Sequence, residues 1–254
     1  MLKDLSKAEW ISILGIPEDI IPEVLILRGT RNLRKQYERH MDFFSDVFEV
    51  NSPNDVTEDV FIGNIEGVNI GYASVYGAPM ASEVVHIFGV LGTSLVIQTG
   101  CCGALSKELI TGDLVYATSA YRGEGVSQYY YRGSSVIDAS SNLLEIIKKE
   151  SLNQEVKVYS GPVFTTSALF AEGRKELEKW CKKGYIAVDM ETAATFAVAE
   201  YFKMKRFSIL FVFDKPEEGS HILSEESKEN ELRKLGESEM IRLALKMALK
   251  HINN

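Results

Sequence analysis

Short apolar runs alternate with longer amphipathic segments along most of the chain. The apolar runs are rich in β-branched and aromatic residues and predict strands at 23–27, 68–75, 94–99, 113–120, 156–163 and 206–213. Apolar residues at helical spacing predict helices at about 30–42, 79–91, 139–151, 172–183, 190–204 and 231–251. Strands that alternate with helices are typical of a layered α/β fold with a largely parallel sheet.

Two further segments refine this picture. Residues 208–213, "SILFVF", are apolar at every position, which predicts a central strand covered by helices on both faces. Residues 215–230 are acidic and polar with few apolar anchors, which predicts a surface loop or mobile flap. No linker rich in proline, glycine or serine divides the chain, so we expect residues 1–254 to form a single domain.

Composition narrows the classes of partner. The chain is 45% hydrophobic and 25% charged, and its net charge of -8 argues against nucleic acid or an anionic membrane as a partner. No apolar run is long enough to span a membrane, and the first ten residues lack a signal-peptide core. The three cysteines and four histidines have no metal-ligand spacing. We therefore expect a cytoplasmic protein without a bound metal.

The residues that follow the predicted strands are the best candidates for a site, because ligands of open α/β sheets bind outside the carboxyl ends of the strands. Six segments occupy such positions: 28–30, 77–80, 99–103, 165–170, 189–192 and 213–218.

Carboxylates stand at two of these ends. Asp189 precedes the helix expected from Met190, and capping of that helix is the simpler explanation for it. Capping does not explain Glu191, a charge at the start of an apolar helix. Asp214 ends an apolar strand, where an α/β enzyme holds an acid or base, but a turn residue before Pro216 is an equally good interpretation.

The segment "QTGCCGAL" supplies a glycine loop. Gly100 and Gly103 allow a ligand to approach the backbone closely, although the spacing matches no dinucleotide or P-loop motif. Cys101 and Cys102 are expected to pack within the loop, because no histidine is positioned by the sequence to activate either thiol.

Taken in order, "LILRGT", "TGCCGAL", "VDMETAATFAVAEYF" and "SILFVFD" resemble the nucleoside phosphorylase-I family. This family includes purine nucleoside phosphorylases, uridine phosphorylases and methylthioadenosine/adenosylhomocysteine nucleosidases. The resemblance extends from about Glu23 to the last helix. It implies a three-layer αβα domain with a mixed, largely parallel central sheet.

The resemblance also implies roles for individual residues. Met190 and Glu191 would hold the ribose, and a carboxylate there stabilises the positive charge that develops on the sugar. Asp214 would hydrogen-bond N7 of a departing purine, which uridine-specific members do not need. Phe170 would stack on the base, and Gly103 would lie against it.

The phosphate site matches the family only in part. Gly29 is present, but Leu33 stands where phosphorylases carry an arginine, and Gln98 and Cys101 replace the next arginine and serine or threonine. Arg31 or Arg34 could supply the missing charge. Glutamine offers neither the charge nor the fork of arginine. Nucleosidases of the family lack these arginines, but their catalytic glutamate in the first loop is also missing here.

We therefore expect cleavage of a nucleoside, with a purine favoured, by phosphorolysis to free base and (deoxy)ribose 1-phosphate. A phosphate-independent nucleosidase and a non-catalytic nucleoside-binding relative remain alternatives. No cofactor is expected beyond phosphate as co-substrate. The resemblance implies a homodimer or homohexamer, and consecutive Tyr129, Tyr130 and Tyr131 predict at least one tyrosine on the surface.

Overall fold

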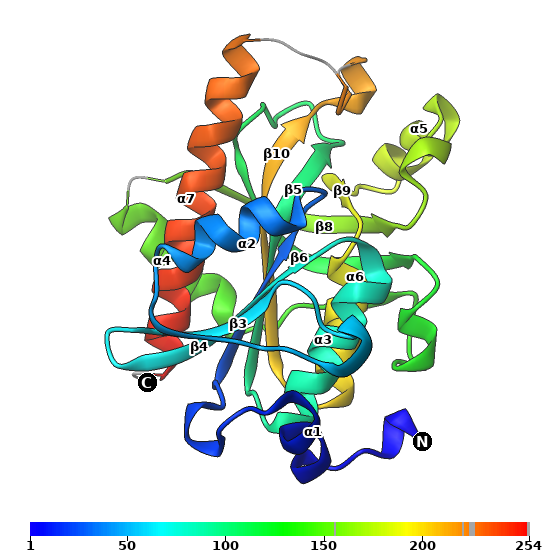
Figure 1. The fold of residues 1–254 in the computed structure, drawn as a ribbon. Coiled ribbons are helices and arrows are strands. Elements are labelled where there is room, and N and C mark those ends of the chain that lie inside the picture. The colour runs from blue at the N-terminus through cyan, green and yellow to red at the C-terminus, as the bar shows by residue number, and fades with distance from the viewer. Residues whose placement is uncertain (155, 220, 224–226, 253–254) are drawn as a thin grey trace.

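The strands of the described residues form one mixed, ten-stranded sheet (Figure 1). The computed structural model describes residues 1–254 apart from 155, 220, 224–226 and 253–254. The strands are β1 (Val24–Gly29), β2 (Ser45–Glu49), β3 (Val60–Ile65), β4 (Val68–Val75), β5 (Leu95–Ala104), β6 (Leu114–Gly123), β7 (Val136–Asp138), β8 (Val158–Thr166), β9 (Ala187–Asp189) and β10 (Lys205–Asp214). The helices are α1 (Lys7–Leu14), α2 (Leu33–Met41), α3 (Gly77–Leu91), α4 (Leu143–Asn153), α5 (Arg174–Lys182), α6 (Thr192–Tyr201) and α7 (Ser227–Ile252).

Strand β5 is the centre of the sheet. It pairs in parallel with β1 and with β10, and its last residues pair antiparallel with β9. From β10 the pairing continues through β6 and β8 back to β9. The strands β5, β10, β6, β8 and β9 therefore close into a ring, and the remaining strands extend the sheet beyond β1.

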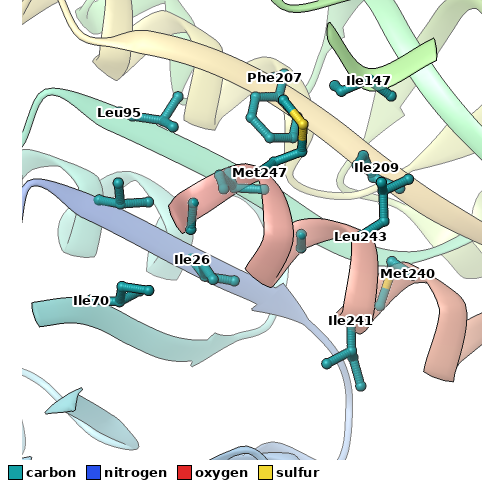
Figure 2. Close-up of a cluster of buried hydrophobic side chains, with 14 of the residues drawn as sticks. Ile26, Ile70, Leu95, Ile147, Phe207, Ile209, Met240, Ile241, Leu243 and Met247 are labelled. Atoms are coloured by element: carbon teal, nitrogen blue, oxygen red, sulfur yellow. The ribbon is translucent and has the colours of Figure 1, made fainter. Parts of the chain in front are cut away.

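Helices cover both faces of the sheet. On one face, α7 and α4 pack on β1, β5 and β10, where Ile26, Leu95, Phe207 and Ile209 meet Leu243 and Met247 of α7 (Figure 2). On the other face lie α1, α3 and α6 (Figure 1). Because the strands of the middle layer are apolar on both sides, burial against both helical layers fixes them in position. The predicted three-layer αβα fold with a mixed sheet is confirmed.

The predicted strands all form, but the sequence pattern missed some elements. Strands β2 and β3 form an antiparallel extension at the edge of the sheet, and β2 is polar and largely exposed, so it has no apolar run. Strands β7 and β9 have only three residues each. Antiparallel pairs also lie within the ring, at β10–β6 and β5–β9, where alternation of strands and helices favoured parallel pairing.

The prediction of a loop over residues 215–230 is partly wrong. A short 3-10 helix spans Pro216–Glu218, and α7 begins at Ser227 rather than at 231. Residues 220 and 224–226 of that stretch lie outside the described part of the chain. Among the described residues, no helix combines the length and the apolar character needed to cross a membrane.

Candidate functional site

A cavity of about 340 Å³ opens at the carboxyl ends of the central strands. We call it the strand-end cavity. The carboxyl ends of β1, β4, β5, β8, β9 and β10 and the segments that follow them contribute to its walls, as the strand-end rule predicts. From these segments the walls include Gly29, Tyr76, Gly103, Phe170, Glu191 and Asp214.

Asp189 anchors the start of α6. Its Oδ2 accepts hydrogen bonds from the backbone N–H of Glu191 (3.2 Å) and of Thr192 (2.7 Å), and its Oδ1 accepts one from the Thr165 hydroxyl (2.6 Å). The predicted N-cap is wrong in its position, because α6 begins at Thr192 and its N-cap residue is Glu191 rather than Asp189. The hydrogen bonds to Asp189 still hold the backbone from which Glu191 projects.

Glu191 is buried, with 5% of its surface exposed, yet it lines the cavity. Its Oε1 accepts a hydrogen bond from the backbone N–H of Gly77 at 2.7 Å. A Cβ atom on Gly29 would lie only 2.7 Å from its Oε2, so the glycine leaves room for this carboxyl. Burial, assisted by the charge of Asp189, raises the pKa of Glu191 to about 8. Such a buried carboxyl gains most from a ligand whose hydroxyls replace the lost water.

Asp214 lies at the end of β10, next to Gly103 of β5. A Cβ atom on Gly103 would meet Asp214 Oδ1 at 3.1 Å and Pro216 Cγ at 3.2 Å. Burial raises the pKa of Asp214 to about 6, against the opposing positive charges of Arg233 and His221. A carboxyl with this pKa carries a proton for part of the time near neutral pH, which suits a general acid. Asp214 and Glu191 therefore line one common cavity.

Glu172 also lines the strand-end cavity, and sequence reasoning did not single it out. It follows the short 3-10 helix Leu169–Ala171, and its Oε1 is buried without a hydrogen-bond partner among the described residues. Burial, followed by the negative charge of Asp214, raises the pKa of Glu172 to about 7. The available signal was an acidic residue two positions after Phe170 at a strand end.

The predicted phosphate residues divide into two groups. Gly29, Arg31 and Cys101 line the cavity. Gln98 does not: its side chain is fully buried, donates to the Thr99 carbonyl (2.9 Å) and accepts from the Thr195 hydroxyl (2.7 Å). Since both ends of its amide are bonded within the protein, Gln98 is a structural residue in this state.

Of the two candidate arginines, Arg31 borders the cavity and Arg34 does not. Arg34 points to solvent and pairs with Glu38 (2.9 Å) and Asp59 (3.5 Å), away from the cavity. The guanidinium of Arg31 lies over the rings of Tyr76 (4.8 Å) and Phe170 (5.7 Å) at the cavity mouth. Arg31 is therefore the candidate that can bring positive charge to a ligand. Phe170 is 84% exposed at this mouth.

Arg28 lies in the strand-end segment 28–30 expected to border the site, but no role was predicted for its side chain. It is buried on the α7 side of β1, bonds to Glu237 at 2.5 Å and donates to the Gly29 carbonyl at 3.2 Å. Its positive charge acts against the rise in the pKa of Glu191 and of Cys101. Arg28 therefore affects the pKa of two residues that line the cavity without lining it itself.

The thiols are poor nucleophiles in this setting. Burial raises the pKa of Cys101 to about 11 and that of Cys102 well above its ordinary value. In the part of the chain that the structure describes, no three metal-ligating side chains gather into a group.

Known proteins resemble this chain in sequence and in fold. The model of the phosphorylase superfamily matches residues 26–246. A DeoD-type purine nucleoside phosphorylase from a Geobacillus species is 29% identical over 188 residues, covering 74% of this chain and 75% of that protein. Another, from an Exiguobacterium species, is 26% identical over 245 residues, covering 94% and 98%.

Solved structures agree with this match. The crystal structure of uridine phosphorylase from Vibrio fischeri superimposes with a TM-score of 0.80 at 27% identity, covering 92% of this chain and 95% of that one. The purine nucleoside phosphorylase from Toxoplasma gondii, solved in complex with immucillin-H, has a TM-score of 0.77 at 18% identity, covering 92% of each chain. The second match supports the fold alone.

Proposed function

The chain belongs to the phosphorylase superfamily, and we propose from this membership and from the strand-end cavity that it cleaves the N-glycosidic bond of a nucleoside. A purine nucleoside is favoured, with phosphate as the second substrate and free base and (deoxy)ribose 1-phosphate as products. The observation that carries the proposal is that Glu191 and Asp214, two buried carboxyls with raised pKa values, line one cavity.

Glu191 and Met190 form the sugar side of the proposed site. As the glycosidic bond breaks, positive charge develops on the ribose ring, and the Glu191 carboxyl accepts hydrogen bonds from the sugar hydroxyls. Its bond from Gly77 and the backbone hydrogen bonds to Asp189 hold it before the ligand arrives. This preorganisation avoids the cost of ordering the carboxyl during the reaction.

Asp214 forms the base side. The departing purine gains negative charge, and a proton donated or shared by Asp214 at N7 makes it a better leaving group. The pKa of about 6 supports this role, because the group keeps a proton available near neutral pH. Gly103 lets the base approach β5, and Phe170 can close over the ring from the cavity mouth.

Phosphorolysis requires an anion near the sugar. Gly29, Cys101 and Arg31 border the cavity on the β1 and β5 side, and Arg31 supplies the charge. Hydrolysis by water is the second candidate, and one observation favours it. The buried amide of Gln98 occupies the position of a phosphate arginine and is already bonded to Thr99 and Thr195.

One assay separates these possibilities. Inosine, adenosine and methylthioadenosine are incubated with the protein, with and without phosphate, and the products are resolved by chromatography. Sugar 1-phosphate formed only with phosphate supports phosphorolysis, whereas free ribose at an equal rate without phosphate supports hydrolysis. Nucleoside binding without turnover would exclude both reactions and leave a non-catalytic binder.

Two broader expectations belong to the same proposal. The protein is proposed to act in a reducing, cytoplasmic setting, in keeping with three free cysteines. It is also proposed to be a homodimer or homohexamer, on the resemblance described above.

A further inference from the structure

The base end of the strand-end cavity holds two carboxyls, although the proposed reaction uses only one. This end is formed by Gly103, Glu172, Leu177, Val188, Asp214 and Pro216. Glu172 comes from the segment after β8 and Asp214 from the end of β10, so the two approach the same space from different strands. Their charges interact, since Asp214 contributes to the raised pKa of Glu172.

No side-chain hydrogen bond to a described residue accounts for the position of Glu172. Its Oε1 is buried and lacks a hydrogen-bond partner among the described residues. A buried polar atom without a partner is costly unless a ligand supplies one. Glu172 lines the cavity together with apolar residues such as Leu177 and Val188, so a ligand bound there is the natural source of the missing bond.

Two neighbouring carboxyls rarely ionise together, because the second negative charge is repelled by the first. The pKa is about 7 for Glu172 and about 6 for Asp214, so near neutral pH the shared proton lies mainly on Glu172 while the cavity is empty. A hydrogen-bond acceptor placed beside Asp214 draws this proton to Asp214 and leaves Glu172 ionised. A pair that shares one proton presents one hydrogen-bond donor and one acceptor.

The purines differ in what they offer to such a pair. Beside the N7 acceptor, adenine presents its exocyclic amino group, which is a donor, whereas a 6-oxopurine presents a second acceptor. We propose that Asp214 donates to N7 while Glu172 accepts from the exocyclic amino group, so that the pair selects 6-aminopurine nucleosides over 6-oxopurine nucleosides. This inference rests on the proposed function, which assigns N7 to Asp214.

The test compares kcat/KM for adenosine and inosine in the wild type, Glu172→Leu and Glu172→Gln at pH 7. The wild type is expected to prefer adenosine. Loss of a hydrogen bond to a charged group should lower kcat/KM for adenosine by about 10- to 100-fold in Glu172→Leu, with a much smaller change for inosine. Glu172→Gln should retain activity but prefer adenosine over inosine by a smaller factor than the wild type, because an amide offers both a donor and an acceptor.

Glu176→Gln is the matched control, since Glu176 lies on α5, is exposed and does not line the cavity. It should leave the adenosine-to-inosine ratio unchanged. A wild-type preference for inosine, or the same ratio in Glu172→Leu as in the wild type, overturns the inference while leaving the proposed function intact.

Absence of turnover on every nucleoside would instead refute the proposed function. Calorimetric titration with adenine and hypoxanthine then tests Glu172 by itself. A preference for adenine that Glu172→Leu abolishes supports the inference, and equal binding or no binding of the two bases rejects it.

Discussion

Glu191 is the residue whose chemistry the fold constrains most tightly, because its carboxyl lies against Gly29 and accepts a bond from Gly77. Glu191→Gln should lower kcat/KM for ribosides by about 3- to 10-fold, the range expected for one hydrogen bond to a neutral group, because a pKa of about 8 keeps the carboxyl mostly protonated at pH 7. The loss should be smaller for 2'-deoxyribosides if the carboxyl holds the 2'-hydroxyl. Steady-state assays on matched riboside and deoxyriboside pairs measure this difference, and equal losses would contradict the ribose contact.

The same residue makes a prediction about stability. The pKa of Glu191 rises from an ordinary 4.5 to about 8 on folding, so the native state holds this proton more tightly than the unfolded chain does. The stabilisation that this proton gives to the native state is complete below about pH 4.5 and is lost as pH rises towards 8. The free energy of unfolding falls over this range by no more than about 1.4 kcal/mol per pH unit. Glu191→Gln should therefore gain stability relative to the wild type between pH 5 and pH 9. Urea unfolding across this range is the measurement, and a constant difference would contradict the raised pKa.

The role of Asp214 can be tested with nucleosides whose bases differ as leaving groups. Asp214→Asn should lower turnover of adenosine by about 10²- to 10⁴-fold, the usual contribution of a general acid. A nucleoside already methylated at N7 carries the positive charge that the acid would supply, so its turnover should fall much less. Rapid-quench measurement on both substrates compares the chemical step directly. Equal losses would exclude leaving-group activation by Asp214.

At the scale of elements, the site depends on how closely β1 approaches the start of α6. A Cβ atom at position 29 would lie 2.7 Å from Glu191 Oε2 and 3.3 Å from Gln98 Nε2. Gly29→Ala should therefore displace the Glu191 carboxyl and lower kcat/KM by about tenfold or more, since small displacements in a preorganised site are costly. Gly125→Ala is the control, because a Cβ there meets nothing within 4 Å. Unchanged kinetics in Gly29→Ala would show that Glu191 can move without loss.

The contact between α7 and β1 rests on charge as well as on apolar packing. Glu237 of α7 pairs with buried Arg28 and with Arg39, and it accepts a bond from Gln36 at 2.9 Å. Glu237→Ala leaves the Arg28 charge buried without its carboxylate, which should cost about 3 to 5 kcal/mol of unfolding free energy. Glu231→Ala, at an exposed position of the same helix, should cost far less. Urea unfolding of the two variants compares them, and similar losses would contradict the importance of the ion pair.

At the scale of the whole molecule, the three consecutive tyrosines differ in exposure. Tyr129 is 79% exposed, while Tyr130 packs inward with its hydroxyl 3.2 Å from His86 Nδ1. The surface tyrosine predicted from the sequence is therefore present, at the end of the short 3-10 helix Ser127–Tyr129. Helix α3 is covered by α1, α6 and the sheet, so its apolar circumference needs no partner subunit.

We expect a homodimer or larger assembly in solution. Light scattering and sedimentation at micromolar concentration should give a mass of at least twice 28.4 kDa. Tyr129→Asp adds a charge to the exposed ring position and should shift the mass towards the monomer if that surface is buried between copies. A fully active monomer would refute a role for a second subunit.

The sequence predicted which residues lie at strand ends better than it predicted which side chains contact each other. Gly29, Gly103, Glu191 and Asp214 could be located because each follows an apolar run, and runs of that kind depend on local pattern. The contacts of Glu172 and Arg28 could not be predicted, because they join segments far apart in the chain. Gln98 was expected at the ligand, yet its amide is satisfied by Thr99 and by Thr195 of α6, a pairing that only the folded layers create.

The position of β10 has a consequence for how the chain emerges during synthesis. This strand lies between β5 and β6 but is synthesised after both. Until β10 is complete, one edge of β5 and one edge of β6 are therefore unpaired. A polypeptide that stops before Lys205 keeps those edges open to pairing with other chains. It also lacks Asp214. A ligand that binds both sides of the cavity can therefore stabilise only the completed chain. It cannot stabilise a ribosome-bound chain while the edges of β5 and β6 are still unpaired.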